Sequence, residues 1–473
     1  MKRKFSLGKI VTEWVGGVGQ HLAKKQVKKT AASKSSIQAN KKVLMFGWEL
    51  PPFNSGGLGV ACFEMAQSMS KKKAEITFVL PKKHDINLPF MKVAFADSDT
   101  KKKHSWTTSL HSKKDKNFAV TEIDTMLFPY ETDESYRQKM SQYSERYAKY
   151  GKGSYASQGL YSNDMIGEVY RYGDAAGEVA KKEKCDVIHA HDWLSFPAGV
   201  RAKQISHKPL VAHVHALEYD RSHEHSVDGR ICRIEKAGLE AADRVIAVSE
   251  YTKQRIIKYY GISEAKIKVV HNGIKIDQNA ATASEEISLK HLKANGRKIV
   301  LFVGRITYQK GVDYLITAAG KVAKLYPKAV FVIAGSGDMR NQIINQVANL
   351  GISDKVYFPG FMREKELEKI YRSADVYVMP SVSEPFGIVA LEALANRVPV
   401  ILSKQSGAVE VLNHALKVDF WDTDELANKI IAVLKYPNLQ RTLSTHGHTE
   451  ANKCTWDNAA DKCLEIYNNL SVA

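Results

Sequence analysis

Short apolar runs alternate with longer amphipathic stretches through the first half of the chain. The runs have the length of β-strands, and most of them end in a polar residue or glycine. They cover residues 43–47, 76–80, 187–191, 210–215, 245–249 and 267–271. Buried strands separated by helix-length segments are typical of βα units around a parallel sheet. We therefore predict an N-terminal Rossmann-like domain over residues 41–285, in which residues 97–175 form an insertion.

A second alternation follows the polar stretch 277–297, which we predict to be the interdomain linker. Its strand-like runs are at 298–304, 329–335, 356–359, 376–380 and 398–402, and its helical patterns at 312–325, 339–350, 365–373 and 387–395. This predicts a second Rossmann-like domain over 286–435, followed by helices over 436–473 that pack back across the domains. The predicted fold class is α/β, with two doubly wound domains facing across a cleft.

The composition fits a two-domain globular protein and excludes other classes. The 473 residues exceed one ordinary domain, and 44% hydrophobic with 25% charged residues is a globular balance. The five cysteines are scattered without a C-x-x-C pair, which argues against a disulfide framework or a zinc knuckle. No apolar stretch has the length of a membrane-spanning helix, and no secretory signal is recognisable. These features predict a cytoplasmic protein.

The formal charge of +18 is concentrated in a basic leader, residues 1–40, predicted to be disordered. Residues 1–42 carry 11 Lys or Arg against one acid, Glu13, so +10 of the charge belongs to this end of the chain. Apolar residues at helical spacing between Ile10 and Leu22 suggest an alternative, a weak contact of residues 1–34 with an anionic membrane surface. Three glycines at positions 16, 17 and 19 weaken such a helix. Charge runs are usually solvated, so no specific nucleic-acid partner is expected.

Two glutamates eight residues apart flank the start of a predicted helix in the second domain. Glu384 follows the strand-like run 376–380, and Glu392 lies within the helix. The backbone N–H groups of Phe386, Gly387 and Ile388 at the helix start form an anion site suited to a diphosphate. The glutamates could then accept hydrogen bonds from sugar hydroxyls, although a solvated helix glutamate is the ordinary alternative.

Cations and glycines are placed to complete such a site. Arg305 and Lys310 directly follow the strand-like run 298–304, where they would neutralise a diphosphate leaving group. In the first domain Gly56 and Gly57 join the first strand to the next helix, and residues without a Cβ let the backbone approach a ligand closely. A turn without a ligand is the alternative at this position.

Two histidine pairs end neighbouring strands of the first domain. His189 and His191 precede Asp192 and Trp193, while the next strand ends in His213 and His215. Such pairs suggest a metal, but no Cys or Glu lies at ligand spacing, and we predict no metal site. We expect His215 and Asp192 to face the cleft, Trp193 to lie beside them near the acceptor, and His189 and His213 to hydrogen-bond within the sheet.

Taken together and in this order, the motifs resemble those of the GT-B glycosyltransferases of family 4, with a starch or glycogen synthase-like N-terminal half. They are Ser55-Gly56-Gly57-Leu58-Gly59, His189-Ala190-His191-Asp192-Trp193, His213-Val214-His215, Gly304-Arg305 with Lys310-Gly311, Ala334-Gly335-Ser336-Gly337 and Glu384-Pro385-Phe386-Gly387 with Glu392. The resemblance covers about residues 41–435. It assigns the N-terminal domain to the acceptor and the C-terminal domain to the donor.

The resemblance also implies roles for single residues and a reaction. Arg305 and Lys310 bind the donor diphosphate, Glu392 the nucleotide ribose and Glu384 the transferred sugar. Gly56 and Gly57 cover the phosphates, and His215 lies beside the sugar. The implied reaction retains the anomeric configuration, needs no metal or other cofactor, and moves a hexose, with glucose as the leading candidate, from an ADP- or UDP-sugar to a carbohydrate acceptor.

Two departures leave the acceptor open. Starch and glycogen synthases carry Lys where this chain has Asn54, and Cys where it has Phe386. Synthesis of an α-glucan of the glycogen or starch type is the leading hypothesis, and transfer to a lipid-linked or cell-surface glycan is the alternative. A nucleotide-sugar epimerase and a polyanion-binding protein are the alternatives from other classes.

Overall fold

The structure is a computed structural model that describes most of both predicted domains. The described residues are 41–51, 57–81, 92–96, 118–123, 165–222, 226–275, 292–293, 296–362 and 364–470. The predicted basic leader, its membrane contact, Asn54 and Gly56 lie outside this set, as does most of the predicted linker. No described helix is long and apolar enough to cross a membrane.

Within the described residues, eight strands form the first sheet, in the order β3-β4-β2-β1-β5-β6-β7-β8. Every pairing in this sheet is parallel. The strands are β1 (Lys42–Phe46), β2 (Glu75–Leu80), β3 (Lys92–Ala96), β4 (Phe118–Ile123), β5 (Val187–His191), β6 (Leu210–Val214), β7 (Arg244–Ala247) and β8 (Ile267–Val269). The described helices between them are α2 (Gly57–Lys71), α4 (Met165–Lys182), α5 (Phe196–Ser206), α6 (Glu218–Arg221), α7 (Gly229–Ala241) and α8 (Glu250–Tyr260).

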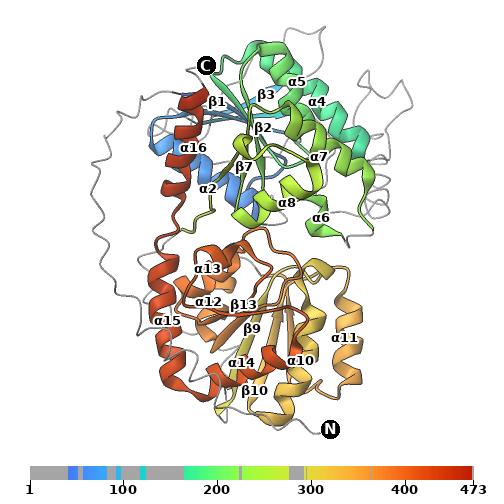
Figure 1. The fold of residues 1–473 in the computed structure, drawn as a ribbon, viewed down its shortest axis with the longest axis vertical. Coiled ribbons are helices and arrows are strands. Elements are labelled where there is room, and N and C mark those ends of the chain that lie inside the picture. Colours follow the sequence, from blue (N-terminus) through green and yellow to red (C-terminus); the bar gives the residue numbers. More distant parts are fainter. Residues whose placement is uncertain are drawn as a thin grey trace. The chain divides into compact units, whose positions relative to one another are not determined.

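The second sheet has six described strands in the order β11-β10-β9-β12-β13-β14, again all parallel. They are β9 (Lys298–Val303), β10 (Ala329–Ala334), β11 (Val356–Gly360), β12 (Val376–Met379), β13 (Val400–Ser403) and β14 (Leu416–Val418). Its helices are α10 (Val312–Leu325), α11 (Arg340–Asn349), α12 (Glu364–Ser373), α13 (Ile388–Ala395), α14 (Thr423–Lys435) and α15 (Pro437–Ala451). The two parallel sheets confirm the predicted α/β class with two Rossmann-like domains (Figure 1).

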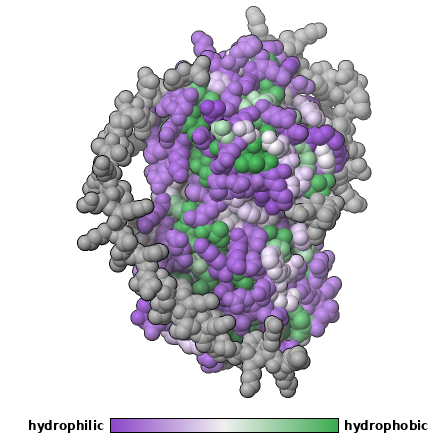
Figure 2. Space-filling view, viewed as in Figure 1, coloured by the Kyte–Doolittle hydropathy of each residue, from purple (hydrophilic) through white to green (hydrophobic). Residues whose placement is uncertain are grey.

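Alternate residues of the second sheet enter different apolar clusters, which is why its strands consist of continuous apolar runs. Val300 and Phe302 of β9 pack in one cluster, whereas Ile299 and Leu301 pack in another on the opposite face. A parallel sheet covered by helices on both faces requires this pattern. The surface has the opposite character to this apolar interior. Figure 2 shows hydrophilic residues over most of the face in view, with apolar residues in smaller patches.

The prediction that residues 97–175 are only an insertion is wrong. Strand β4 lies inside the first sheet between β2 and β3, and helix α4 begins at Met165. Tyr172 of α4 is fully buried and donates a hydrogen bond to the carbonyl of Gly47 at 2.9 Å. Polar residues surround β4 and α4 in the sequence. The apolar pattern therefore did not reveal that β4 belongs to the sheet and that α4 packs on the core.

The last helix, α16 (Trp456–Leu470), returns to the first domain. Its residues Trp456, Cys463 and Tyr467 are buried in the first-domain cluster, and Cys463 Sγ lies 3.9 Å from Met65 Sδ of α2. Figure 1 shows α16 and α2 side by side. Helix α15 instead packs on α13, where His448 Nδ1 lies 3.1 Å from the carbonyl oxygen of Leu394.

Candidate active site

Two loops meet at the point of the second sheet where the strand order reverses. The chain runs outward from β9 to β10 and β11, then returns to the other side of β9 with β12. The loops that follow β9 and β12 therefore leave from adjacent strand ends, which is where doubly wound sheets bind ligands. The side-chain amide of Gln309 in the first loop donates to the carbonyl of Ser383 in the second at 3.1 Å, and the amide N–H of Val382 donates back to the carbonyl of Gln309 at 2.9 Å.

An ion pair joins the two loops beside these hydrogen bonds. Lys310 Nζ donates to Glu384 Oε2 at 2.6 Å, and the side chains are only 18% and 9% exposed. Ser381 Oγ adds a hydrogen bond to the same carboxylate oxygen at 3.2 Å. Two residues 74 positions apart that were predicted from separate motifs are thus in direct contact. The cation and the carboxylate hold each other in place at the switch point.

Arg305 lies on the same loop and is half-buried. Its guanidinium donates to the side-chain oxygen of Gln309 at 3.3 Å. The loop passes close to the end of β10, because a Cβ on Gly335 would lie 1.9 Å from the carbonyl oxygen of Gly304. Gly335 also has a φ of +144°, which a residue with a side chain rarely adopts. The glycine motif after β10 therefore serves the close packing of this loop.

The start of helix α13 offers amide groups next to the ion pair. Gly387 precedes the helix with a φ of +101°, in the left-handed region. Within the described residues, the amide N–H groups of Gly387 and Ile388 have no hydrogen-bond acceptor. The side chain of Phe386 is buried and stacks on His271, with ring centroids 5.7 Å apart. The ring of Phe386 belongs to the core, so the prediction that this residue contributes to donor binding concerns its backbone N–H and stays a prediction.

Glu392 lies just over two turns beyond Glu384 and makes a separate contact. Tyr371 Oη donates to Glu392 Oε2 at 3.1 Å, and burial raises the pKa of the Glu392 carboxyl above its ordinary value. Burial, and then the negative charges of Glu384 and Glu392, raise the pKa of Tyr377. Both glutamates therefore lie near the same tyrosine ring, although only Glu384 is paired with Lys310.

The first domain has a contrasting group at the ends of β5 and β6. Asp192 has a φ of +57° and is buried, and Oδ1 of its carboxylate accepts from the amide N–H groups of His215 at 2.6 Å and Ala216 at 3.3 Å. Arg221 donates to Asp192 Oδ2 at 3.2 Å. Trp193 is also buried, at 5% exposure. The prediction that Asp192 and Trp193 line an open cleft is corrected: Asp192 holds the loop after β6, and Trp193 is part of the core.

Four imidazole rings form a compact array on the same two strands. His189 Nε2 lies 3.1 Å from His213 Nδ1, as predicted for hydrogen bonding within the sheet, and His191 Nδ1 lies 3.0 Å from His215 Nε2. Burial lowers the pKa of His191 to about 3, and burial beside His191 and Arg221 lowers the pKa of His215. His215 is half-buried, whereas the other three rings are buried. Burial disfavours the charged form of all four imidazoles by lowering the pKa of each.

The segment that follows His215 reaches the loop that carries Lys310. Helix α6 begins three residues after His215 and contacts the 3-10 helix η5 (Tyr308–Lys310). Next to this contact, Ser383 Oγ donates to Asp220 Oδ1 of α6 at 2.6 Å. The structure therefore brings together the two chain segments that carry His215 and Lys310.

Comparison with known proteins decides the family. Residues 283–449 match the model of the glycosyl transferases group 1, and residues 154–278 match that of the Glycosyltransferase Family 4. An uncharacterised glycosyltransferase of Methanocaldococcus jannaschii is 36% identical over 296 residues, which are 60% of this chain and 75% of that protein. The chain is a family 4 glycosyltransferase. This confirms the resemblance on which the predicted fold and reaction class were based.

Two further similarities bear on this glycosyltransferase. A glycogen synthase of Mycobacterium tuberculosis is 30% identical over 324 residues, which are 65% of this chain and 76% of that protein. The solved structure of Anabaena HepE in complex with UDP and glucose matches with a TM-score of 0.62 over 90% of this chain and 99% of that chain, at 19% identity. The second similarity supports the fold alone.

Sequence reasoning missed two features of this glycosyltransferase. Glu410 of η6 (Gly407–Glu410) accepts from the amides of Glu250 and Tyr251 at 2.9 and 2.8 Å, so a carboxylate of the second domain caps a helix of the first. Cys62 of α2 lies beside His191 and His215. Neither residue belongs to a motif, and no spacing rule in the sequence would have found these contacts.

Proposed function

We propose that this glycosyltransferase transfers a hexose, with glucose as the leading candidate, from an ADP- or UDP-sugar to a carbohydrate acceptor with retention of configuration. The observation that carries the proposal is the contact between α6, which begins three residues after His215, and the 3-10 helix that ends at Lys310. The similarity to a glycogen synthase supports transfer of this kind, with glucose as the sugar.

Lys310 and Arg305 are the proposed diphosphate ligands. In the absence of donor, Lys310 is neutralised by Glu384, and a diphosphate would compete for the same ammonium group. The amide N–H groups of Gly387 and Ile388 would donate to the remaining phosphate oxygens at the helix start. Negative charge grows on the departing phosphate as the glycosidic bond breaks, so these fixed positive groups stabilise the transition state more than the ground state.

The glutamates are the proposed contacts to the sugar nucleotide. Glu384 would accept from hydroxyls of the transferred hexose once Lys310 turns to the diphosphate, and Glu392 would accept from the ribose. We infer a front-face displacement in which the departing phosphate oxygen takes the proton of the acceptor hydroxyl. His215 would lie beside the sugar. No nucleophile from the protein, no metal and no other cofactor takes part in this reaction.

An α-glucan of the glycogen or starch type is the proposed acceptor. A lipid-linked or cell-surface glycan is the second candidate, favoured by the +10 charge of residues 1–42, which suits an anionic membrane surface. The test is the release of nucleoside diphosphate from ADP-, UDP- and GDP-sugars with glycogen, maltooligosaccharides or a lipid extract. Release that depends on a glucan supports the leading proposal, and release with lipid alone replaces it with the second. Conversion of the sugar nucleotide without transfer to any acceptor would contradict both.

A further inference from the structure

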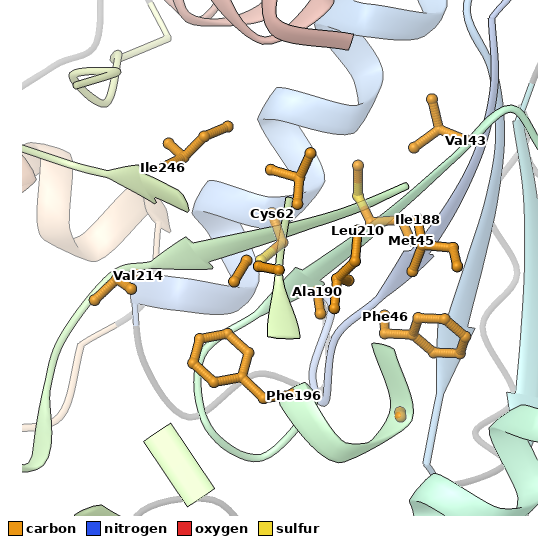
Figure 3. Packing of buried hydrophobic residues seen from close by; sticks show 14 of the residues in the cluster. Val43, Met45, Phe46, Cys62, Ile188, Ala190, Phe196, Leu210, Val214 and Ile246 are labelled. Carbon is orange, nitrogen blue, oxygen red and sulfur yellow. The ribbon is translucent and has the colours of Figure 1, made fainter. Parts of the chain in front are cut away.

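The thiol of Cys62 lies beside two of the four imidazoles, those of His191 and His215, at the switch point of the first sheet. Cys62 Sγ and one ligand nitrogen from each of His191 and His215 all lie within 4.8 Å of one another. Figure 3 shows Cys62 on helix α2 among the buried side chains that cover the strands of this sheet. The three residues come from different elements, which are α2, the end of β5 and the loop after β6. The sequence argument against a metal was the lack of such a cysteine at ligand spacing.

Two ring nitrogens of the imidazole array are buried without a partner. Among the described residues, neither His191 Nε2 nor His213 Nε2 has a hydrogen-bond partner. Buried polar atoms are nearly always satisfied, so an unpaired ring nitrogen inside a cluster of ligand-type side chains indicates a group that the protein itself does not supply. The unpaired nitrogen of His191 is Nε2, whereas its Nδ1 faces His215 Nε2, so this observation marks the array as incomplete without itself identifying the ligand atom.

The spacing suits a zinc-like ion. Nitrogen ligands bind Zn²⁺ at about 2.0–2.1 Å and thiolates at about 2.3 Å, so two tetrahedral nitrogen ligands are roughly 3.3 Å apart. His191 Nδ1 and His215 Nε2 are 3.0 Å apart, which needs only a small opening of their hydrogen bond. Of the three residues, His215 is half-buried, whereas Cys62 and His191 are buried.

We propose that Cys62, His191 and His215 bind one Zn²⁺ or a similar borderline-soft divalent ion, with the fourth position left to water or a sugar hydroxyl. On binding, the Cys62 thiol releases its proton to solvent as the metal–sulfur bond forms. The hydrogen bond between His191 and His215 is replaced by two metal–nitrogen bonds. Zinc sites with three protein ligands keep the fourth position for water or substrate, whereas structural zinc sites are closed.

Occupancy of this site would inhibit transfer. The consequence rests on the proposed function, because it assumes that His215 lies beside the transferred sugar, whereas metal binding itself does not depend on that assumption. A metal that fixes His215 removes its ring from the sugar and places a positive ion near the reacting centre.

Isothermal titration calorimetry of the full-length protein with zinc chloride tests the site directly. We expect the protein to bind one equivalent of zinc in a Cys62-dependent way, and this binding should be lost or weakened by at least about tenfold in Cys62→Ser. Cys185→Ser is the matched control, since Cys185 is also buried but lies outside the imidazole array. Cobalt chloride gives a second readout, a thiolate-to-metal charge-transfer band present in the wild type and the control and absent from Cys62→Ser.

The outcomes separate the site from the reaction. Equal zinc binding by the wild type and Cys62→Ser, or no binding by either, would overturn the site. Zinc inhibition of transfer that is relieved in Cys62→Ser, whose activity without metal matches the wild type, supports the site and the role of His215 together. Cys62-dependent binding that leaves transfer unchanged would keep the site and overturn the proposed position of His215.

Discussion

The switch points of the two sheets have the same topology and opposite chemistry. In the second sheet, the loops after β9 and β12 carry an ion pair, glycines and two amides for which the described residues supply no acceptor, all suited to an anion. In the first sheet, the end of β5, which borders the switch point, and the neighbouring end of β6 carry imidazoles over a buried aspartate that accepts from backbone amides and from Arg221. A site for a charged leaving group needs fixed cations, whereas a surface for neutral hydroxyl groups does not. Under the proposed function, this contrast gives donor chemistry to the second domain and positioning to the first.

Removal of Lys310, the cation at the switch point of the second sheet, is expected to have the largest effect on activity. Lys310→Ala should lower kcat by about 10²–10³-fold, because a preorganised charge at the leaving group is lost. Folding should change little, since the ammonium group is not part of the apolar core. Lys321→Ala is the matched control, because Lys321 is also half-buried and paired with an acid, Asp424, but lies on the outer part of α10. Steady-state kinetics of both variants decide the matter, and near-normal kcat in Lys310→Ala would remove the donor assignment.

The buried aspartate of the first domain should matter for stability. Asp192→Ala leaves the amides of His215 and Ala216 without this acceptor and removes one of the acceptors of the Arg221 guanidinium, and breaking a buried pair in this way costs about 3–5 kcal/mol. Urea unfolding followed by circular dichroism measures the loss. The comparison predicts a much smaller stability change for Glu384→Ala at the other switch point, where Lys310 can turn to solvent. An equal loss of unfolding free energy in Asp192→Ala and Glu384→Ala would contradict the difference between the two sites.

Close packing of the second switch point can be tested separately. Gly335→Ala places a methyl group 1.9 Å from the Gly304 carbonyl and should cost about 3 kcal/mol or more. Gly351→Ala is the control for backbone strain alone, because Gly351 also has a positive φ but a Cβ there would meet nothing within 4 Å. It should cost only about 1 kcal/mol. Thermal unfolding of the two variants compares them, and equal shifts in Tm would show that the loops do not depend on this approach.

The smallest expected effect is the contribution of Glu410 to stability at acid pH. Burial alone would raise the pKa of Glu410, but hydrogen bonds from His271 and from the amides of Glu250 and Tyr251 outweigh it and lower this pKa. A carboxyl whose pKa is lowered by folding stabilises the folded state above its ordinary pKa and loses that contribution as pH falls through the lower value. Stability of the wild type should therefore decline more steeply than that of Glu410→Gln below about pH 4.5. Parallel unfolding curves between pH 6 and pH 3 would exclude the contribution.

The fold was predictable because its information is local. Continuous apolar runs such as those of β9 and β10 identify buried parallel strands without any tertiary knowledge. Strand β4 escaped because its run, Phe118–Ile123, contains Thr121 and Glu122 and lies among polar residues. Its place in the sheet is set by pairing with β2 and β3 and is not evident from its own pattern.

The residues of the candidate site likewise fall into those that the sequence identified and those that it did not. Lys310 and Glu384 were identified from their positions at strand ends, and their contact follows from the adjacency of β9 and β12. Asp192 was misplaced because a polar residue at a strand end has the same sequence signature whether it faces a ligand or accepts from backbone amides. Cys62 could not be foreseen, since it meets the histidines only through the packing of α2 on the sheet.

The most direct test of the donor assignment is a crystal structure of the protein with a nucleoside diphosphate or a sugar nucleotide that is not hydrolysed. The account predicts that the diphosphate lies at the second switch point, within hydrogen-bond distance of Lys310 Nζ, the Arg305 guanidinium and the amides of Gly387 and Ile388. The contact between Lys310 and Glu384 should be broken or shared. A diphosphate bound elsewhere, with that ion pair intact, would contradict the account.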